Sequence, residues 1–218
     1  MTAGAILAGG QARRYGGADK SRLVVDGASI LDRQIAALRP LCDTIVAIVN
    51  DDKRRARFAD ARISTCVDLI PGTGAIGGIY TALAATGADA VITIACDLPN
   101  LPTGLLQQLL ERSEGADAAW VVTPRGPEPL VACYRQTARD AIRACIDAGE
   151  LKAADLARTL RIIELTMVDV EAFGPARHVL ANINTPDEYA SVVGSHTSQN
   201  APMVSHGIRP PDPRGEAG

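Results

Sequence analysis

Aromatic residues and an excess of charge of one sign are both lacking in this sequence. Phe, Trp and Tyr make up 3% of its 218 residues, so few side chains can stack on the bases of single-stranded nucleic acid, and the core must be mainly aliphatic. The 22 Lys and Arg residues face 25 Asp and Glu residues, for a net charge of −3. That balance provides no electrostatic footprint for nucleic acid or for an anionic membrane surface. We therefore expect neither as a partner.

Histidine is scarce, and the cysteines form no recognisable pairs. Of three histidines, His196 and His206 lie in a polar stretch near the C-terminus, which leaves His178 as the one imidazole in a segment expected to be ordered. Ser-His-Asp catalysis and His-x-Glu-x-x-His zinc sites therefore lack parts. Five cysteines without a Cys-x-x-Cys pair argue against a disulfide framework or a zinc ribbon. With no signal-peptide pattern and no apolar run near the ~18 residues of a membrane span, we expect a cytoplasmic protein.

The sequence does have a regular alternation of strand-like runs and helical periods. Residues 3–8, 45–49, 63–67 and 90–96 are short and almost unbroken apolar runs, as expected for parallel strands buried on both faces. Between them, helices are predicted after the Ser29 and Asp32 capping pattern, over 75–85, and over 103–110 with Thr103 as the N-cap. This order predicts a doubly wound α/β sheet with right-handed crossovers.

The second half of the chain is less regular. Strands are predicted over 118–123, 130–134 and 161–168, with a helix whose inner face carries Ala138, Ile142 and Cys145. Thr185 and Glu188, with a proline between them, are typical of a helix start. Residues 194–218 have almost no aliphatic side chains and are predicted to be a disordered tail.

A glycine-rich segment directly follows the first predicted strand. It reads Leu7-Ala8-Gly9-Gly10, and paired glycines after a strand leave backbone N–H groups for an anion and allow close approach of a nucleotide. Glycines are absent from the positions that a dinucleotide fingerprint or a Walker loop would require. Arg14 and Lys20 add positive charge to the same loop. The alternative is a structural turn with solvated basic side chains.

Carboxylates follow two of the other predicted strands. Asp97 lies directly after the strand at 90–96, where open α/β sheets place ligands and where an oxygen ligand suits Mg²⁺; alternatively, it caps the turn before Pro99. Asp68 follows the strand at 63–67 and precedes the glycine-rich stretch 71–78. A helix N-terminus with close-packing glycines is a compatible interpretation of that stretch.

Residues 7–20 closely resemble the signature loop of the molybdenum cofactor guanylyltransferases, and the segments at 96–99 and 182–186 resemble the family's Cys-Asp-x-Pro and Asn-x-Asn-Thr-Pro motifs. The resemblance extends over about residues 3–193. It implies an α/β fold of three layers, the Rossmann-like nucleotidyltransferase fold with a mostly parallel central sheet. Within this domain, 1–193, it implies a nucleotide-binding half at about 1–112 and an acceptor-binding half at about 113–193. The sequence departs from the family at 74–76, where the usual Gly-Pro-Leu lacks its proline.

The resemblance also implies a set of site residues. Lys20, Arg14 and Asp97 would be catalytic, with Asp97 as the ligand of Mg²⁺, and Asn182 and Asn184 would bind the acceptor. The implied nucleotide-binding residues are Leu7, Ala8, Gly9, Gly10, Lys20, Asn50, Asp68 and Asp97. Independently of the resemblance, Asn184 could simply hold the turn before Thr185.

The implied reaction is transfer of GMP from GTP to molybdenum-molybdopterin, with release of pyrophosphate. Transient contact with molybdoenzymes or cofactor-delivery proteins is implied as well. One rival is a cytidylyltransferase for the same cofactor, although the family's cytidine enzymes tend to have Leu-Ala-Ala-Gly where this chain has a second glycine; another is a nucleotidyltransferase for a different small phosphate. A rival of another class is a module that binds GTP or pterin without turnover.

Overall fold

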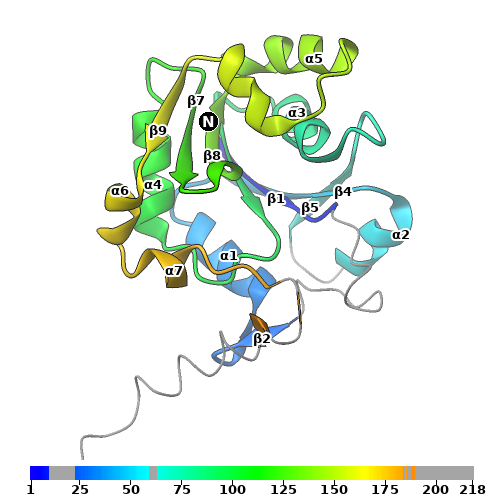
Figure 1. Cartoon of the computed structure of the whole chain (residues 1–218). Coiled ribbons are helices and arrows are strands. Elements are labelled where there is room, and N and C mark those ends of the chain that lie inside the picture. The colour runs from blue at the N-terminus through cyan, green and yellow to red at the C-terminus, as the bar shows by residue number, and fades with distance from the viewer. Residues whose placement is uncertain (10–22, 59–62, 184, 186–187, 190–218) are drawn as a thin grey trace, which may run out of the picture.

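The computed structural model describes residues 1–9, 23–58, 63–183, 185 and 188–189. Within these ranges the main sheet has seven strands in the order β5-β4-β1-β6-β8-β7-β9, and helices cover both of its faces (Figure 1). The predictions for Gly10, Arg14, Lys20 and Asn184, and for the tail at 194–218, lie outside the described residues.

The first half of the chain forms the parallel part of the sheet. β1 (Thr2–Leu7) pairs in parallel with β4 (Thr44–Val49) on one side and with β6 (Ala90–Ala95) on the other, and β5 (Ser64–Val67) pairs in parallel with β4. All four predicted strands are present, close to their predicted bounds. The fold prediction of a mostly parallel α/β sheet is confirmed.

The second half adds an antiparallel hairpin and one further strand. β8 (Gly126–Arg135) runs antiparallel to β6, β7 (Ala118–Thr123) runs antiparallel to β8, and β9 (Ile162–Leu165) is parallel to β7. β8 begins at Gly126 instead of the predicted residue 130, because the hairpin turn is short and Gly126 supplies a positive φ of 118°. The strand prediction over 161–168 is wrong beyond Leu165.

Helix caps explain why some predicted ends of helices and strands match the structure and others do not. After Leu165, Thr166 and Asp169 form a capping box that starts α6 (Met167–Glu171) and ends β9. Thr103 is not an N-cap, because Pro102 occupies that position before α4 (Thr103–Arg112), and the Thr103 hydroxyl donates instead to the carbonyl of Ala37 at 3.1 Å. The reciprocal capping bonds between Thr185 and Glu188 are present, as predicted.

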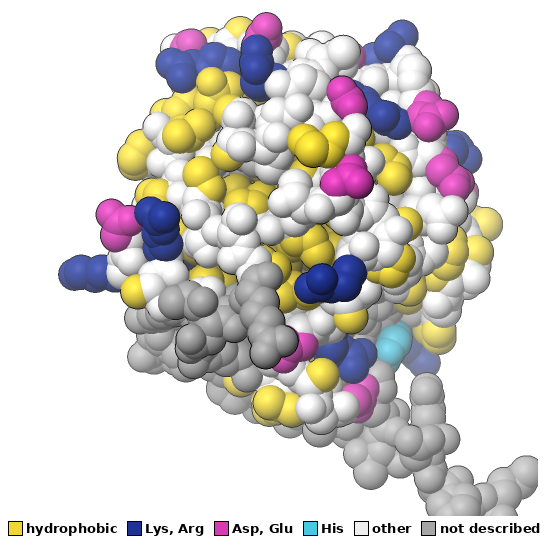
Figure 2. Space-filling model, turned by 180° about the vertical axis from the view of Figure 1, so that it is seen from behind, with side chains coloured by type: hydrophobic (Ala, Val, Ile, Leu, Met, Phe, Trp, Pro, Cys, Tyr) yellow, Lys and Arg dark blue, Asp and Glu magenta, His cyan; other side chains and the backbone are white. Residues whose placement is uncertain are grey.

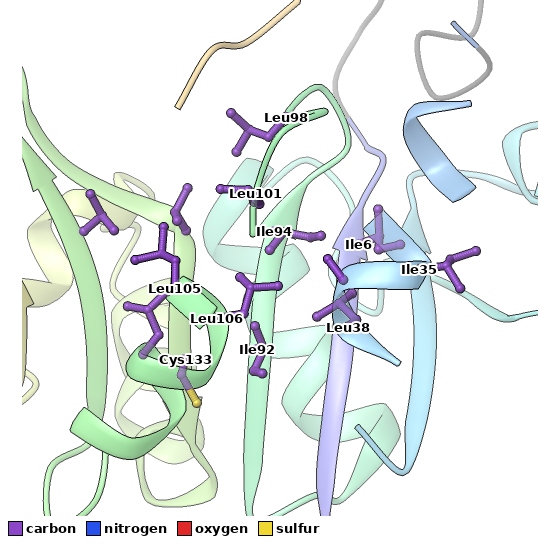
Figure 3. Packing of buried hydrophobic residues seen from close by; sticks show 14 of the residues in the cluster. Ile6, Ile35, Leu38, Ile92, Ile94, Leu98, Leu101, Leu105, Leu106 and Cys133 are labelled. Carbon is purple, nitrogen blue, oxygen red and sulfur yellow. The ribbon is translucent and has the colours of Figure 1, made fainter. Parts of the chain in front are cut away.

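The strands divide their side chains between two hydrophobic layers. One layer lies under α1 (Ile30–Leu38) and α4, where Ile6, Ile92 and Ile94 meet leucines from both helices (Figure 3). The other lies under α3 (Gly74–Thr86) and α5 (Arg139–Asp147), and it takes the alternate strand residues, such as Ala5 and Val91. The result is the expected arrangement of three layers.

Short elements complete the structure at its margins. α2 (Asp52–Arg55) and a 3₁₀ turn (Ala56–Phe58) follow β4, two further 3₁₀ turns flank α5 (Gln136–Ala138 and Ala153–Arg158), and α7 (Ala176–Val179) follows α6. A small hairpin of β2 (Val24–Val25) and β3 (Ala28–Ser29) leads into α1.

The distribution of surface charge and the state of the cysteines agree with what the composition indicates. On the face shown in Figure 2, basic and acidic side chains are interspersed and do not gather into a patch of one sign. All five cysteines are free thiols. No helix in the described ranges combines the length and the apolar character needed to cross a bilayer.

We expect the Ser29 cap to contribute measurably to stability. The Ser29 hydroxyl accepts from the backbone N–H of Asp32 at 3.1 Å and donates to the Asp32 carboxylate at 2.6 Å. Ser29→Ala should therefore lower the free energy of unfolding by about 1 kcal/mol, measured by urea denaturation. Ser64→Ala, at an exposed position in β5, is the matched control. An equal effect of both changes would contradict the role of the cap.

Candidate active site

The predicted site residues of the first half lie together at one edge of the sheet. The parallel strands β1, β4, β5 and β6 end there, and Gly9, Asn50, Asp68 and Asp97 follow them within two residues. The sheet ladder continues beyond the strand ends, since the N–H of Ala8 donates to Ile48 at 2.8 Å and that of Asp68 to Val49 at 2.8 Å. The backbone that carries these side chains is therefore held by the sheet itself.

The side chain of Asn50 fills the space beside the Cα atom of Gly9. The Asn50 side-chain amide donates to the Gly9 carbonyl, and a Cβ at Gly9 would collide with the Asn50 side chain. Glycine is thus the residue that this position accepts while Asn50 stays in place. The structure brings Asn50 into the predicted site beside the start of the glycine loop.

A pocket of about 470 Å³, which we call the strand-end pocket, opens beside these residues. Gly78 lets α3 approach β1 closely, because a Cβ there would lie 2.8 Å from a Leu7 methyl group. The wall is largely apolar or glycine, with two polar side chains aimed into it. The lining residues are Leu7, Gly9, Ile48, Asn50, Asp68, Pro71, Gly72, Gly74, Ala75, Gly78 and Leu130.

Asp68 is the charged residue among the described residues that line the strand-end pocket. Its Oδ1 atom is buried and has no hydrogen-bond partner among the described residues. Burial raises the pKa of the Asp68 carboxyl to about 6. The N–H of the following residue, Leu69, donates to the Thr81 hydroxyl of α3 at 3.0 Å, which holds the backbone on that side. A half-buried carboxylate with an unsatisfied oxygen is suited to accept hydrogen bonds from a ligand.

Asp97 lies in an adjoining pocket of about 320 Å³, the middle pocket, together with Glu128, Arg125 and Asn182. Ala75 and Leu130 line both pockets, so the two adjoin one another. Burial raises the pKa of Glu128, the charge of Asp97 raises it as well, and Arg125 and the Thr123 hydroxyl oppose this rise. Two carboxylates therefore act on one another across the middle pocket.

A third pocket, of about 470 Å³, adjoins the middle pocket and is called the outer pocket. Thr123, Arg125, Leu180 and Asn182 line both. Arg125 and Arg177 line the outer pocket together with the acidic residue Glu188 and with apolar residues such as Met167 and Leu180. We call these three adjoining pockets together the trench; they follow one another from Asp68, past Asp97, to the two arginines.

The segment that carries Asn182, predicted to bind the acceptor, is attached directly to the Asp97 turn. The backbone N–H of Ile183 donates to the Asp97 carbonyl at 3.0 Å, and Ile183 is buried against Val25 and Ile30. This anchorage places the exposed Asn182 beside the middle pocket. The structure therefore brings one of the two predicted acceptor residues close to Asp97.

Sequence reasoning missed Glu128, Arg125 and Arg177. Glu128 and Arg125 enter the site because β8 runs antiparallel to β6, which carries the hairpin back over the end of that strand. The position of Glu128, just after a turn and before the apolar run at 130–134, was a signal that it could belong to the site. Nothing in the local sequence shows which strand Glu128 lies beside. Arg177 comes from a short helix that no clear periodicity marks.

The donor set of the middle pocket fits a hard divalent cation. Asp97 and Glu128 offer carboxylate oxygens and Asn182 an amide oxygen, the ligand types that Mg²⁺ prefers. The described residues contain no group of three or more His, Cys, Asp and Glu side chains that could hold a metal alone. Mg²⁺ in nucleotide sites is commonly held by one or two carboxylates together with substrate phosphates.

Comparisons with known proteins give the family. Residues 4–164, more than half of the chain, match the family model of the MobA-like NTP transferase domain. A molybdenum cofactor guanylyltransferase from Shewanella baltica is 30% identical over 186 residues, which cover 84% of this chain and 91% of that relative.

Two solved structures share the fold of this chain. Molybdopterin-guanine dinucleotide biosynthesis protein A from Archaeoglobus fulgidus matches with a TM-score of 0.77 and 25% identity over 91% of this chain and 100% of that one. A Mycobacterium tuberculosis protein in complex with manganese shares the fold, with a TM-score of 0.62 and 15% identity over 89% of this chain and 98% of that one. The chain belongs to the MobA-like NTP transferase family, and it is a nucleotidyltransferase.

Proposed function

We propose that the protein transfers GMP from GTP to the phosphate of molybdenum-molybdopterin and releases pyrophosphate. The observation that carries this proposal is the trench, in which a nucleoside-sized pocket and a second, arginine-bearing pocket adjoin on either side of Asp97. A transferase needs such adjoining donor and acceptor sites, because reaction requires the two substrates to meet in one orientation. The Shewanella relative is named a molybdenum cofactor guanylyltransferase, and this name supports GTP as the nucleotide and the molybdenum cofactor as the acceptor.

The strand-end pocket would take the nucleoside of GTP. Asn50 and Asp68 offer an amide and a carboxylate to the base or the ribose, and Leu7, Ala8 and Gly9 would bring backbone close to the ligand. Gly10, Arg14 and Lys20 follow in the sequence, and we assign their backbone N–H and cationic groups to the triphosphate. In this proposal residues 1–112 form the nucleotide-binding half and residues 113–193 the acceptor-binding half.

Asp97 would hold Mg²⁺ with the phosphate oxygens, and Glu128 faces the same cavity. The bound ion would neutralise charge on the triphosphate and on the leaving pyrophosphate. Asp97 lies between the strand-end and outer pockets, which is where the α-phosphate would have to be for transfer. Asp97 would contribute its negative charge, which would hold the ion, and its position beside the segment that would bind the acceptor.

The acceptor would lie in the middle and outer pockets. Asn182 and Asn184 would orient it, and Arg125 and Arg177 would attract its anionic groups. An oxygen of the acceptor phosphate attacks the α-phosphorus; the new P–O bond forms as the bond to the pyrophosphate oxygen breaks, and pyrophosphate leaves. No covalent enzyme intermediate is required, so the chain needs no nucleophile, and positioning with charge neutralisation does the catalysis.

The rivals are a cytidylyltransferase for the same cofactor, a nucleotidyltransferase for another small phosphate, and a module that binds without turnover. A cytoplasmic enzyme of the proposed kind would pass its product on by transient contact with molybdoenzymes or delivery proteins. Nucleotide choice and turnover separate these alternatives.

Nucleotide choice can be tested by thermal melting with Mg²⁺ present. A ligand that binds only the native state raises the melting temperature according to its affinity. At equal concentrations GTP should raise the melting temperature more than CTP, ATP or UTP. If CTP gives the largest increase, the guanine assignment is wrong.

Metal dependence can be tested at Asp97. Asp97→Asn keeps the side-chain shape and removes the charge, so turnover should fall by about two to three orders of magnitude with the fold intact. Pyrophosphate release with GTP and acceptor measures the loss, and circular dichroism checks the fold. Asp140→Asn, on the exposed start of α5, is the matched control. Near-normal Mg²⁺-dependent rates in Asp97→Asn would place the metal elsewhere.

Asp68 predicts a pH dependence of GTP binding. Because burial raises the pKa of Asp68 to about 6, the carboxyl is largely protonated at pH 5 and ionised at pH 7.5. Nucleoside N–H and O–H donors bond more strongly to the ionised form, so the GTP dissociation constant should fall roughly fivefold as the pH rises through this range.

The control for this prediction is Asp68→Asn measured in parallel by equilibrium dialysis. The phosphates of GTP titrate equally with both proteins, and the ratio of their dissociation constants isolates Asp68. A ratio that does not change between pH 5 and pH 7.5 would show that Asp68 makes no contact with the nucleotide.

A further inference from the structure

The turn that carries Asp97 is held by a side chain from a distant helix. Gln34 of α1 is 2% exposed, and its Nε2 atom donates to the carbonyl of Ala95 at 2.7 Å and to that of Leu98 at 3.0 Å. These two carbonyls lie on either side of Asp97 along the chain. One amide group therefore spans the turn that presents the carboxylate.

The chemistry of this contact requires an amide nitrogen. Both partners are carbonyl oxygens, which can only accept, so the nitrogen of the Gln34 amide must face them. The other end of the amide, Oε1, is buried with no partner among the described residues. A glutamine on the apolar face of a helix is costly to bury, and the bonds to the turn are what offset that cost here.

Arg33, the neighbouring residue of α1, holds the next part of the turn. Its Nε donates to the Pro99 carbonyl at 2.9 Å, and one terminal nitrogen donates to the Asn100 side chain at 3.1 Å. Asn100 in turn donates to the carbonyl of His178 at 3.2 Å, beside the acceptor segment. Leu98 and Leu101 of the same loop pack into the core below (Figure 3).

The acceptor segment holds the turn from the opposite side, through the bond from the Ile183 N–H to the Asp97 carbonyl. Carbonyls at 95, 97, 98 and 99 thus all accept hydrogen bonds from outside the turn. Ala95 ends β6 and residues 96–99 belong to no helix or strand, yet the backbone of the turn is held almost residue by residue.

We propose that Gln34, assisted by Arg33, is a positioning residue that sets the direction of the Asp97 carboxylate and thereby the affinity of the site for its divalent cation. This inference rests on the proposed role of Asp97. Gln34 and Arg33 are not among the described residues that line the trench. Both act through the backbone of the turn, and groups that orient a metal ligand commonly change metal affinity by 10 to 100-fold.

The test measures how much Mn²⁺ strengthens GTP binding. GTP dissociation constants are determined by equilibrium dialysis with and without Mn²⁺, and their ratio reports the metal bound at Asp97 together with the nucleotide. Gln34→Met keeps the length of the side chain and removes the donor. It should reduce the enhancement by about tenfold, while the metal-free dissociation constant for GTP stays near that of the wild type.

A second readout separates positioning from simple loss of stability. Turnover of Gln34→Met should recover toward the wild-type rate when Mn²⁺ or Mg²⁺ is raised, since extra metal compensates for weaker binding. Arg33→Met should shift the enhancement in the same direction by a smaller factor, and it serves as the second variant if Gln34→Met does not fold.

The matched control is Ser113→Ala. Ser113 is a fully buried polar residue away from the trench, and its hydroxyl donates to Leu110 at 2.7 Å and accepts from Arg135 at 2.8 Å. Its replacement also breaks buried hydrogen bonds and should lower the melting temperature, but the Mn²⁺ enhancement should stay at the wild-type value.

Asp97→Asn separates failure of this inference from failure of the proposed function. If Asp97→Asn retains the enhancement, or the wild type has none, the metal assignment itself is wrong. If Asp97→Asn abolishes the enhancement while folded Gln34→Met and Arg33→Met retain it in full, the positioning role is refuted and the proposed function stands.

Discussion

The residues of the site lie together because β1 pairs in parallel with β4 on one side and with β6 on the other. Parallel strands end at the same edge of a sheet, so one short glycine segment and three side chains from distant parts of the sequence arrive at one place. Gly4 and Gly78 show how much depends on this arrangement. A Cβ at Gly4 would approach Leu38 of α1 to 3.1 Å, and one at Gly78 would approach Leu7 to 2.8 Å. A side chain at either glycine would therefore require these leucines to shift before the helices on the two faces could pack as closely.

The antiparallel strand β8 then converts an edge into a trench. By pairing with β6 it carries the hairpin turn and Glu128 over the end of the parallel sheet, where they face Asp97. A continued parallel sheet would have brought another strand end to the same edge instead of a hairpin. In the proposed function, the change of strand direction is therefore what would separate a donor side, built from the first half, from an acceptor side, built from the second.

Much of the fold was predictable because the buried parallel strands carry strong local signals. The runs around Ile6, Ile48 and Ile92 are apolar on both faces, and Ser29 marks the start of α1. The failures have tertiary causes. Thr103 has the character of an N-cap but bonds to α1, and the hairpin extends past the apolar residues of β8 because Gly126, Pro127 and Glu128 pair with β7. The site was predictable where residues follow strands, as Asp68 and Asp97 do. It was not predictable for Glu128, Arg177 and Gln34, whose roles depend on packing between segments far apart in the sequence.

The turn at Asp97 shows why the site needs support from outside its own segment. Asp97 and Glu128 both line the middle pocket, and the charge of Asp97 adds to the rise in the pKa of Glu128 that burial mainly causes, against the charge of Arg125. In the proposed function, a cation bound with substrate phosphates would require the Asp97 turn to be held in place before it binds. The bonds from Gln34, Arg33 and Ile183 supply that restraint. Because Ile183 follows Asn182 directly, its bond also ties the segment that carries Asn182 to the Asp97 turn. In the proposed function, the protein would thereby set the geometry between the two substrates before either one binds.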